Sequence, residues 1–142
     1  MRILALDVGQ KRIGVAVSDA LNLIAQGIET IKREDLSGTL NRISSLVEEY
    51  DVSKIIVGLP FNMNGTKGTS VKLTEEFIDE LKKKTGVTIE TRDERLTTLQ
   101  GERVLLEANV SRKKRKLAID KIAAQLILQS YLEEHVQKNK PE

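Results

Sequence analysis

The chain has 142 residues, with 23 Lys or Arg against 21 Asp or Glu, one His and no Cys. The lack of Cys excludes disulfides, a thiolate zinc site and a Cys nucleophile, and a single His excludes a multi-histidine metal site. No apolar run approaches the roughly 18 residues of a membrane span, and Asp7 breaks the apolar start too early for a signal peptide. We therefore expect one cytoplasmic domain over residues 1–142, with no membrane association.

The first third of the chain predicts three strands. Residues 2–8 are an almost unbroken apolar run, which is typical of a strand buried on both faces. After a turn at residues 9–11, a second β-rich run covers residues 13–17, and a third strand is expected within residues 24–31. Short connections between these runs predict an antiparallel meander.

Helices and strands then alternate. Apolar residues at helical spacing over 36–50 predict a helix with Ser37 as its N-cap. The remaining elements are a strand at 54–59 that Pro60 ends, an Asn- and Gly-rich loop at 60–68, a helix at about 69–84, a strand at 87–91, a helix from Thr97 or Thr98 to about Ala108, a basic loop, and a helix at about 117–136. This order predicts an α/β fold, a five-stranded mixed sheet flanked by helices, in which the helix-linked strands lie parallel to the first strand.

Two carboxylates occupy positions that are otherwise apolar. Asp7 stands near the end of the first strand among apolar neighbours, and a lone buried carboxylate is costly unless it is paired, hydrogen-bonded or bound to a metal. Asp120 falls on the same face of the last helix as Ala124 and Ile127. Each has a purely structural alternative: Asp7 could accept hydrogen bonds from the turn that follows it, and Asp120 could favour the helix dipole.

A third carboxylate follows the fifth strand. If that strand stays regular through residue 93, Asp93 shares a face with Ile89 and Glu94 lies opposite; if the strand ends or bulges earlier, Glu94 can turn inward. Alternation along the strand therefore leans to Asp93. Converging carboxylates without Cys or His partners favour Mg²⁺ or Mn²⁺, and such ions catalyse phosphodiester cleavage.

The charge is unevenly distributed. Residues 111–142 hold eight Lys or Arg and four Asp or Glu, a net of +4, which leaves −2 for residues 1–110. Five consecutive cations carry most of this excess: Arg112, Lys113, Lys114, Arg115 and Lys116. Such a run is either a solvated surface segment or an arm that contacts nucleic-acid phosphates. Only four residues are aromatic, so we expect recognition of backbone and shape rather than base stacking.

Taken together, the motifs resemble the YqgF family of pre-16S rRNA nucleases, also described as Holliday-junction resolvases. The resemblance spans nearly the whole chain and rests on five segments in order: Leu6-Asp7-Val8-Gly9, Ile13 to Ser18, Val57 to Pro60 with Asn62 and Asn64-Gly65, Asp93 to Thr98, and Asp120 with Ala123-Ala124 and Ile127-Leu128. It implies a ribonuclease-H-like fold with Asp7, Glu94 and Asp120 as catalytic and metal-binding acids. On the third acid the resemblance disagrees with the alternation along the strand; we follow the resemblance and keep Asp93 as the alternative.

The resemblance implies a Mg²⁺-dependent nuclease that processes the 5′ end of the small-subunit rRNA precursor. Candidates for phosphate contacts are Lys11, Arg12, Asn62, Arg95 and the run from Arg112 to Lys116. Three alternatives stay open: resolution of branched DNA, for which a homo-oligomer is expected, a non-catalytic RNA-binding factor of ribosome assembly, and one half of an actin- or hexokinase-like nucleotide site. The last is disfavoured because that fold needs two such domains.

Overall fold

The computed structural model describes residues 1–61, 64–94 and 112–135, and for residues 112–120 it describes the backbone alone. Within these ranges the elements are β1 (Arg2–Val8), β2 (Arg12–Ser18), β3 (Ala25–Lys32), α1 (Leu36–Glu49), β4 (Val52–Leu59), α2 (Thr69–Lys84), β5 (Thr88–Asp93) and α4 (Arg112–His135).

The five strands form one mixed sheet in the order β3-β2-β1-β4-β5. β1 and β2, and β2 and β3, pair antiparallel, whereas β4 pairs parallel with both β1 and β5. The predicted meander and the predicted parallel strands are therefore both confirmed. Because β1, β4 and β5 run the same way, their carboxyl ends meet at one edge of the sheet.

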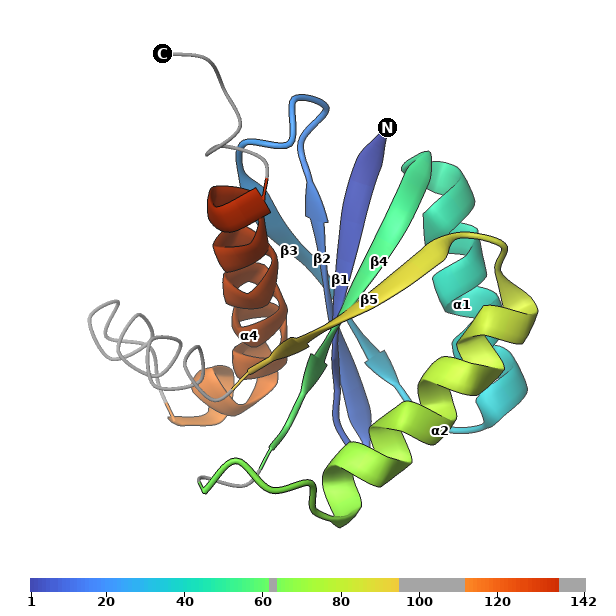
Figure 1. Cartoon of the computed structure of the whole chain (residues 1–142), viewed down its shortest axis with the longest axis vertical. Helices are drawn as coiled ribbons and strands as arrows, with labels where there is room; N and C mark the ends of the chain where they lie inside the picture. Colours follow the sequence, from blue (N-terminus) through green and yellow to red (C-terminus); the bar gives the residue numbers. More distant parts are fainter. Residues whose placement is uncertain (62–63, 95–111, 136–142) are drawn as a thin grey trace.

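Helices cover both faces of the sheet, with α1 and α2 on one side and α4 on the other (Figure 1). The α1/α2 side is packed by large apolar residues such as Leu6, Val57 and Phe77. The α4 side is packed by smaller residues of the sheet, including Ala5 and Ala16. Small side chains let the long helix lie close to the strands. Among the described residues, no helix is long and apolar enough to cross a membrane.

Two predictions about helix ends are corrected. The N-cap of α1 is Asp35 rather than Ser37, because the helix begins at Leu36 and the Asp35 carboxylate accepts a hydrogen bond from the amide of Gly38. The run Arg112–Lys116 lies inside α4 and not in a loop, since Lys and Arg are good helix formers and neither Gly nor Pro interrupts the segment. The helix predicted at 97–108 lies outside the described residues.

Side chains of α4 also form hydrogen bonds with β3, the strand at one side of the sheet, and with the loop before it. The carbonyl oxygens of the Gln125 and Gln129 side chains accept hydrogen bonds from the amides of Gly27 and Ala25, at 3.3 and 2.9 Å. The Gln129 amide donates to the carbonyl of Leu23 at 3.2 Å. These bonds satisfy part of the edge strand β3 and fix this turn of α4 against it.

Candidate active site

Asp7 lies at the carboxyl end of β1 and on the face of the sheet that α4 covers. Side chains alternate along a strand: Leu4 and Leu6 pack in the α1/α2 core, whereas Ile3 and Ala5 pack against α4. Asp7 continues the second series. The pairing of Leu6 with Val57 places Asp7 beside Gly58 of β4, one step further along the two parallel strands.

Glu94 directly follows β5 and reaches across β4 to the same place. Its amide donates a hydrogen bond to the carbonyl of Leu59 at 3.2 Å. A Cβ atom built on Gly58 would lie 2.5 Å from Oε2 of Glu94 and 2.6 Å from Cδ1 of Ile127. Only a glycine at position 58 therefore leaves room for this carboxylate between the sheet and α4.

The carboxyl groups of Asp7 and Glu94 are hydrogen-bonded to each other. Burial, the negative charge of Asp7, this hydrogen bond and the negative charge of Asp93 together raise the pKa of Glu94 to about 9. Glu94 is thus the protonated partner at neutral pH. All of these effects raise the pKa of Glu94. A cation placed between the two carboxyl groups would lower that pKa and favour the ionised forms of both.

Alternation along the fifth strand correctly placed Asp93 on the face of Ile89, but Asp7 lies on the opposite face of the sheet. The strand is regular to residue 93, and Ile89 is partly buried and packs against the α1/α2 core. Arg92, however, lies on the opposite face, where Nη2 donates to Ser130 Oγ and Glu134 Oε1 of α4, both at 2.6 Å. Glu94 continues the series of Arg92, and this is the face that carries Asp7.

Asp120 lies in the N-terminal half of α4, two helical turns before Ile127. Figure 1 shows that α4 runs back along the sheet, so that its N-terminal half lies at the edge where β1, β4 and β5 end. The side chain of Asp120 is outside the described part. Among the described residues, no group of three His, Asp or Glu is arranged to hold a metal ion.

A cleft of about 840 Å³ opens beside the acid pair along this edge of the sheet. Its walls come from the ends of β1 and β4, the turn after β1, the segment before α1, and α2. The lining residues include Asp7, Gly9, Gln10, Arg33, Leu36, Pro60, Leu73, Phe77, Glu80 and Glu94. Leu36 and Leu73 are 46% and 47% exposed, so part of the cleft wall is apolar.

The predicted phosphate-contacting residues can be placed only in part. Lys11 is exposed and Arg12 half-buried in and after the turn whose Gln10 lines the cleft. Asn62 and Arg95 lie outside the described residues. The backbone of Arg112–Lys116 forms the start of α4, at the same edge of the sheet as the acid pair (Figure 1).

Arg33 is a cation of the cleft that the sequence did not indicate. It follows β3 in a run of charged residues typical of a surface loop. In the structure its Nη1 donates a 2.7 Å hydrogen bond to the carbonyl of Gly9, and its Cζ lies 5.1 Å from the centre of the Phe77 ring.

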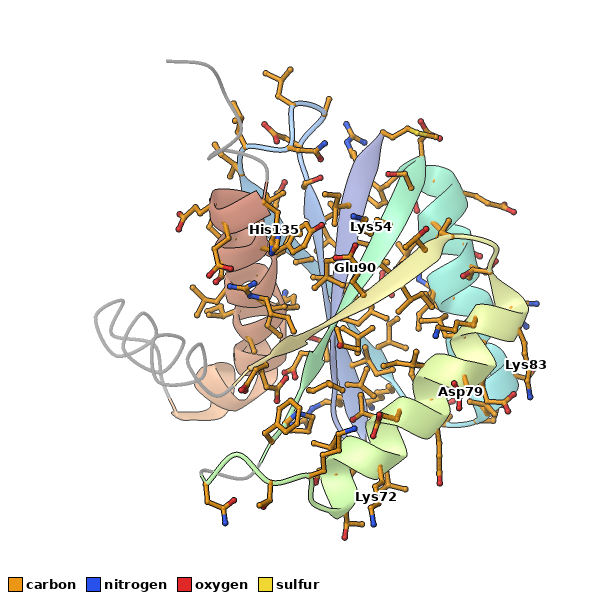
Figure 2. The ribbon with its side chains drawn as sticks, viewed as in Figure 1. Lys54, Lys72, Asp79, Lys83, Glu90 and His135 are labelled. Atoms are coloured by element: carbon orange, nitrogen blue, oxygen red, sulfur yellow. The ribbon has the colours of Figure 1, made fainter. Side chains whose placement is uncertain are left out.

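The other polar cluster between the sheet and α4 lies away from the acid pair. Lys54 contacts Glu90 at 2.8 Å and the hydroxyl of Tyr131 at 3.0 Å, and His135 stacks on Tyr131 with ring centres 4.5 Å apart. Figure 2 shows Lys54, Glu90 and His135 together near the far end of α4. The single His is therefore part of this contact and not of the cleft.

The five-stranded mixed sheet with helices on both faces is the ribonuclease-H-like fold, which is also the fold of solved resolvases. A structure of T. thermophilus RuvC in complex with a Holliday junction substrate superposes with a TM-score of 0.60 at 15% identity, covering 95% of this chain and 97% of that one. The fowlpox virus resolvase with its junction DNA gives a TM-score of 0.55 at 17% identity, covering 96% and 99%.

Sequence similarity identifies the family. The model of the RuvX family, described as Holliday junction resolvase, matches residues 1–134, and this chain belongs to that family. A protein of Natranaerobius thermophilus named "Putative pre-16S rRNA nuclease" is 53% identical over 139 residues, covering 98% of this chain and 99% of that protein. A protein of the same name from Thermoanaerobacter pseudethanolicus is 52% identical over 141 residues, covering 99% and 100%.

Proposed function

We propose that this protein is a nuclease that hydrolyses phosphodiester bonds with the help of Mg²⁺ or Mn²⁺, and that its substrate in the cytoplasm is the precursor of the small-subunit (16S) rRNA, trimmed at the 5′ end. The observation that carries the proposal is the hydrogen-bonded pair of Asp7 and Glu94 at the carboxyl edge of the sheet. The name of the similar proteins supports the choice of substrate.

The residues present fit a hard divalent cation. The donors are carboxylate oxygens only, which suits Mg²⁺ or Mn²⁺ rather than softer metals. In this proposal Asp7 and Glu94 hold the ion together with Asp120 from α4. When bound, such an ion supplies Lewis acidity to the phosphate and lowers the pKa of an attacking water.

The protein prepares this site through rigid strands. β1 and β4 fix Asp7 beside Gly58, and Gly58 leaves the space into which Glu94 reaches. Because the pKa of Glu94 is raised to about 9, cation binding at neutral pH must displace its proton. Phosphates of the nucleic-acid strand on either side of the cleavage point would be contacted by polar and basic residues, namely Lys11, Arg12, Asn62, Arg95 and the cations from Arg112 to Lys116.

The test is cleavage of an end-labelled small-subunit rRNA precursor in the presence of Mg²⁺. The wild type should produce a discrete product, and Asp7→Asn and Asp120→Asn should each reduce the rate by about a hundredfold or more. Arg42→Gln, which removes the ion pair between α1 and Glu29 of β3, is a matched control that should cleave normally, because neither residue is among those that line the cleft. A wild type that cleaves nothing with any divalent ion would instead support a non-catalytic RNA-binding factor.

Resolution of branched DNA is the second candidate, and the description of the family model favours it. A labelled four-way DNA junction, tested beside the rRNA precursor with the same variants, separates the two candidates. Symmetric cleavage of the junction and no cleavage of the precursor would assign the resolvase activity. Such an activity would also require two copies of the chain on one junction, which sedimentation of the complex can measure.

A further inference from the structure

Arg33 occupies an unusual position for a surface arginine. It lines the cleft that also contains Asp7 and Glu94. Two contacts hold its guanidinium group: a 2.7 Å hydrogen bond from Nη1 to the Gly9 carbonyl, and the Phe77 ring, whose centre lies 5.1 Å from Cζ. Its own amide donates to the carbonyl of Lys11 at 2.9 Å. The turn after β1 and the end of β3 are thereby held together.

None of these contacts cancels the charge of Arg33. Among the described residues, Arg42 forms an ion pair with Glu29 and Arg92 with Glu134, whereas no described carboxylate forms an ion pair with Arg33. A carbonyl oxygen and an aromatic face orient a guanidinium and leave its full positive charge. Of its five N–H groups, one is used by Gly9.

The place of Arg33 relative to the acids sets what it can bind. The carbonyl that holds it belongs to Gly9, two residues after Asp7, which is a span of at most about 7 Å along the chain. The guanidinium is therefore within one or two nucleotides of a phosphate that reacts beside Asp7. The neighbouring wall contains the exposed side chains of Leu36 and Leu73, which can contact sugar and base without reading sequence.

We propose that Arg33 forms a phosphate-binding subsite of the cleft, which grips the backbone of the substrate strand one or two nucleotides from the bond that is cleaved. The inference rests on the proposed function, because it takes the ligand of the cleft to be a nucleic-acid strand. The forked N–H groups bind two phosphate oxygens at once. Gly9 and Phe77 hold the fork in place before the substrate arrives, which reduces the entropy lost on binding.

The test measures binding without turnover. A short labelled single-stranded RNA is titrated with the wild type, Arg33→Gln and the control Arg42→Gln in EDTA, from about 50 to about 200 mM salt. Arg33→Gln should bind about tenfold more weakly and lower the salt slope of log K by about 0.7, the value for one phosphate contact on a single strand. Arg42→Gln should match the wild type in both.

An unchanged slope in Arg33→Gln, or an equal loss in Arg42→Gln, would overturn the proposal. Arg33→Lys is a second variant, which keeps the positive charge and loses the forked N–H groups of the guanidinium. It should keep the wild-type salt slope of log K and bind the RNA more weakly. A folded Arg33→Lys variant with a reduced salt slope, or with the wild-type affinity, would contradict the assignment. Melting temperatures establish that each variant is folded. Failure of the proposed function is a separate result, namely a wild type that binds RNA in EDTA and cleaves none in Mg²⁺.

Discussion

Replacing Gly58 by Ala should damage the active site more than it damages the fold. The added Cβ would lie 2.5 Å from Oε2 of Glu94 and 2.6 Å from Cδ1 of Ile127, and Cβ contacts under 3.0 Å essentially never occur. Both neighbours are the ends of side chains and can move, so we expect overpacking of about 1–2 kcal/mol. The movement takes the Glu94 carboxylate away from Asp7, and a misplacement of about 1 Å in a catalytic group costs about a hundredfold in rate.

Gly86→Ala is the matched control for this substitution. A Cβ built on Gly86 meets nothing within 4 Å, and the φ angle of Gly86 is not positive. This variant should be as stable as the wild type or more stable by up to about 1 kcal/mol, because Ala reduces the entropy of the unfolded chain. Its cleavage rate should be unchanged.

The two variants are compared by urea unfolding and by single-turnover cleavage of the precursor RNA. We expect Gly58→Ala to remain folded, with a free energy of unfolding lower by about 1–2 kcal/mol, and to lose most of its cleavage. The reasoning is refuted if Gly58→Ala cleaves at the wild-type rate. It is also refuted if Gly86→Ala loses as much activity as Gly58→Ala.

Three further predictions concern stability. The pKa of Glu94 is raised to about 9 in the folded protein, so the metal-free protein keeps a proton that the unfolded chain releases above about pH 4.5, and the free energy of unfolding should fall as the pH rises from there toward 9. In urea titrations in EDTA, Glu94→Gln should remove this pH dependence. The variant should be more stable than the wild type at pH 7 by up to about 3 kcal/mol. Adding Mg²⁺ at pH 8 should raise the melting temperature of the wild type and not that of Asp7→Asn, since an ion that binds only the folded form stabilises it. Asp35→Ala should lower the free energy of unfolding by about 1 kcal/mol through loss of the helix cap on Gly38, whereas Ser37→Ala should change it by only a few tenths.

Most of the fold could be predicted because its signals are local. Unbroken apolar runs marked the strands buried on both faces, and helical spacing predicted α2 with the bounds that the structure has, Thr69–Lys84. The start of α4 was missed because a run of five cations suits both an exposed loop and an exposed helix surface. The cap of α1 was misplaced by two residues because Asp35 and Ser37 are both suitable capping residues.

The site depends on information that no single strand contains. Alternation shows which residues of β5 share a face, but only the pairing of β1 with β4 and β4 with β5 shows which face Asp7 occupies. The residues alone therefore favoured Asp93, and the structure instead brings Glu94 to Asp7. The position of Arg33 in the cleft could not be predicted for a similar reason, because Phe77 lies 44 positions further along the chain and contacts Arg33 only in the folded protein.

The most direct test of the proposed site is the rate of precursor cleavage in Mg²⁺ by Glu94→Gln and by its neighbour variant Asp93→Asn. Both substitutions replace a carboxyl group by an amide of nearly the same shape, at adjacent positions of the chain. The proposed site predicts a loss of about a hundredfold or more for Glu94→Gln and a rate within a few-fold of the wild type for Asp93→Asn. The opposite result, with Glu94→Gln active and Asp93→Asn inactive, would contradict it.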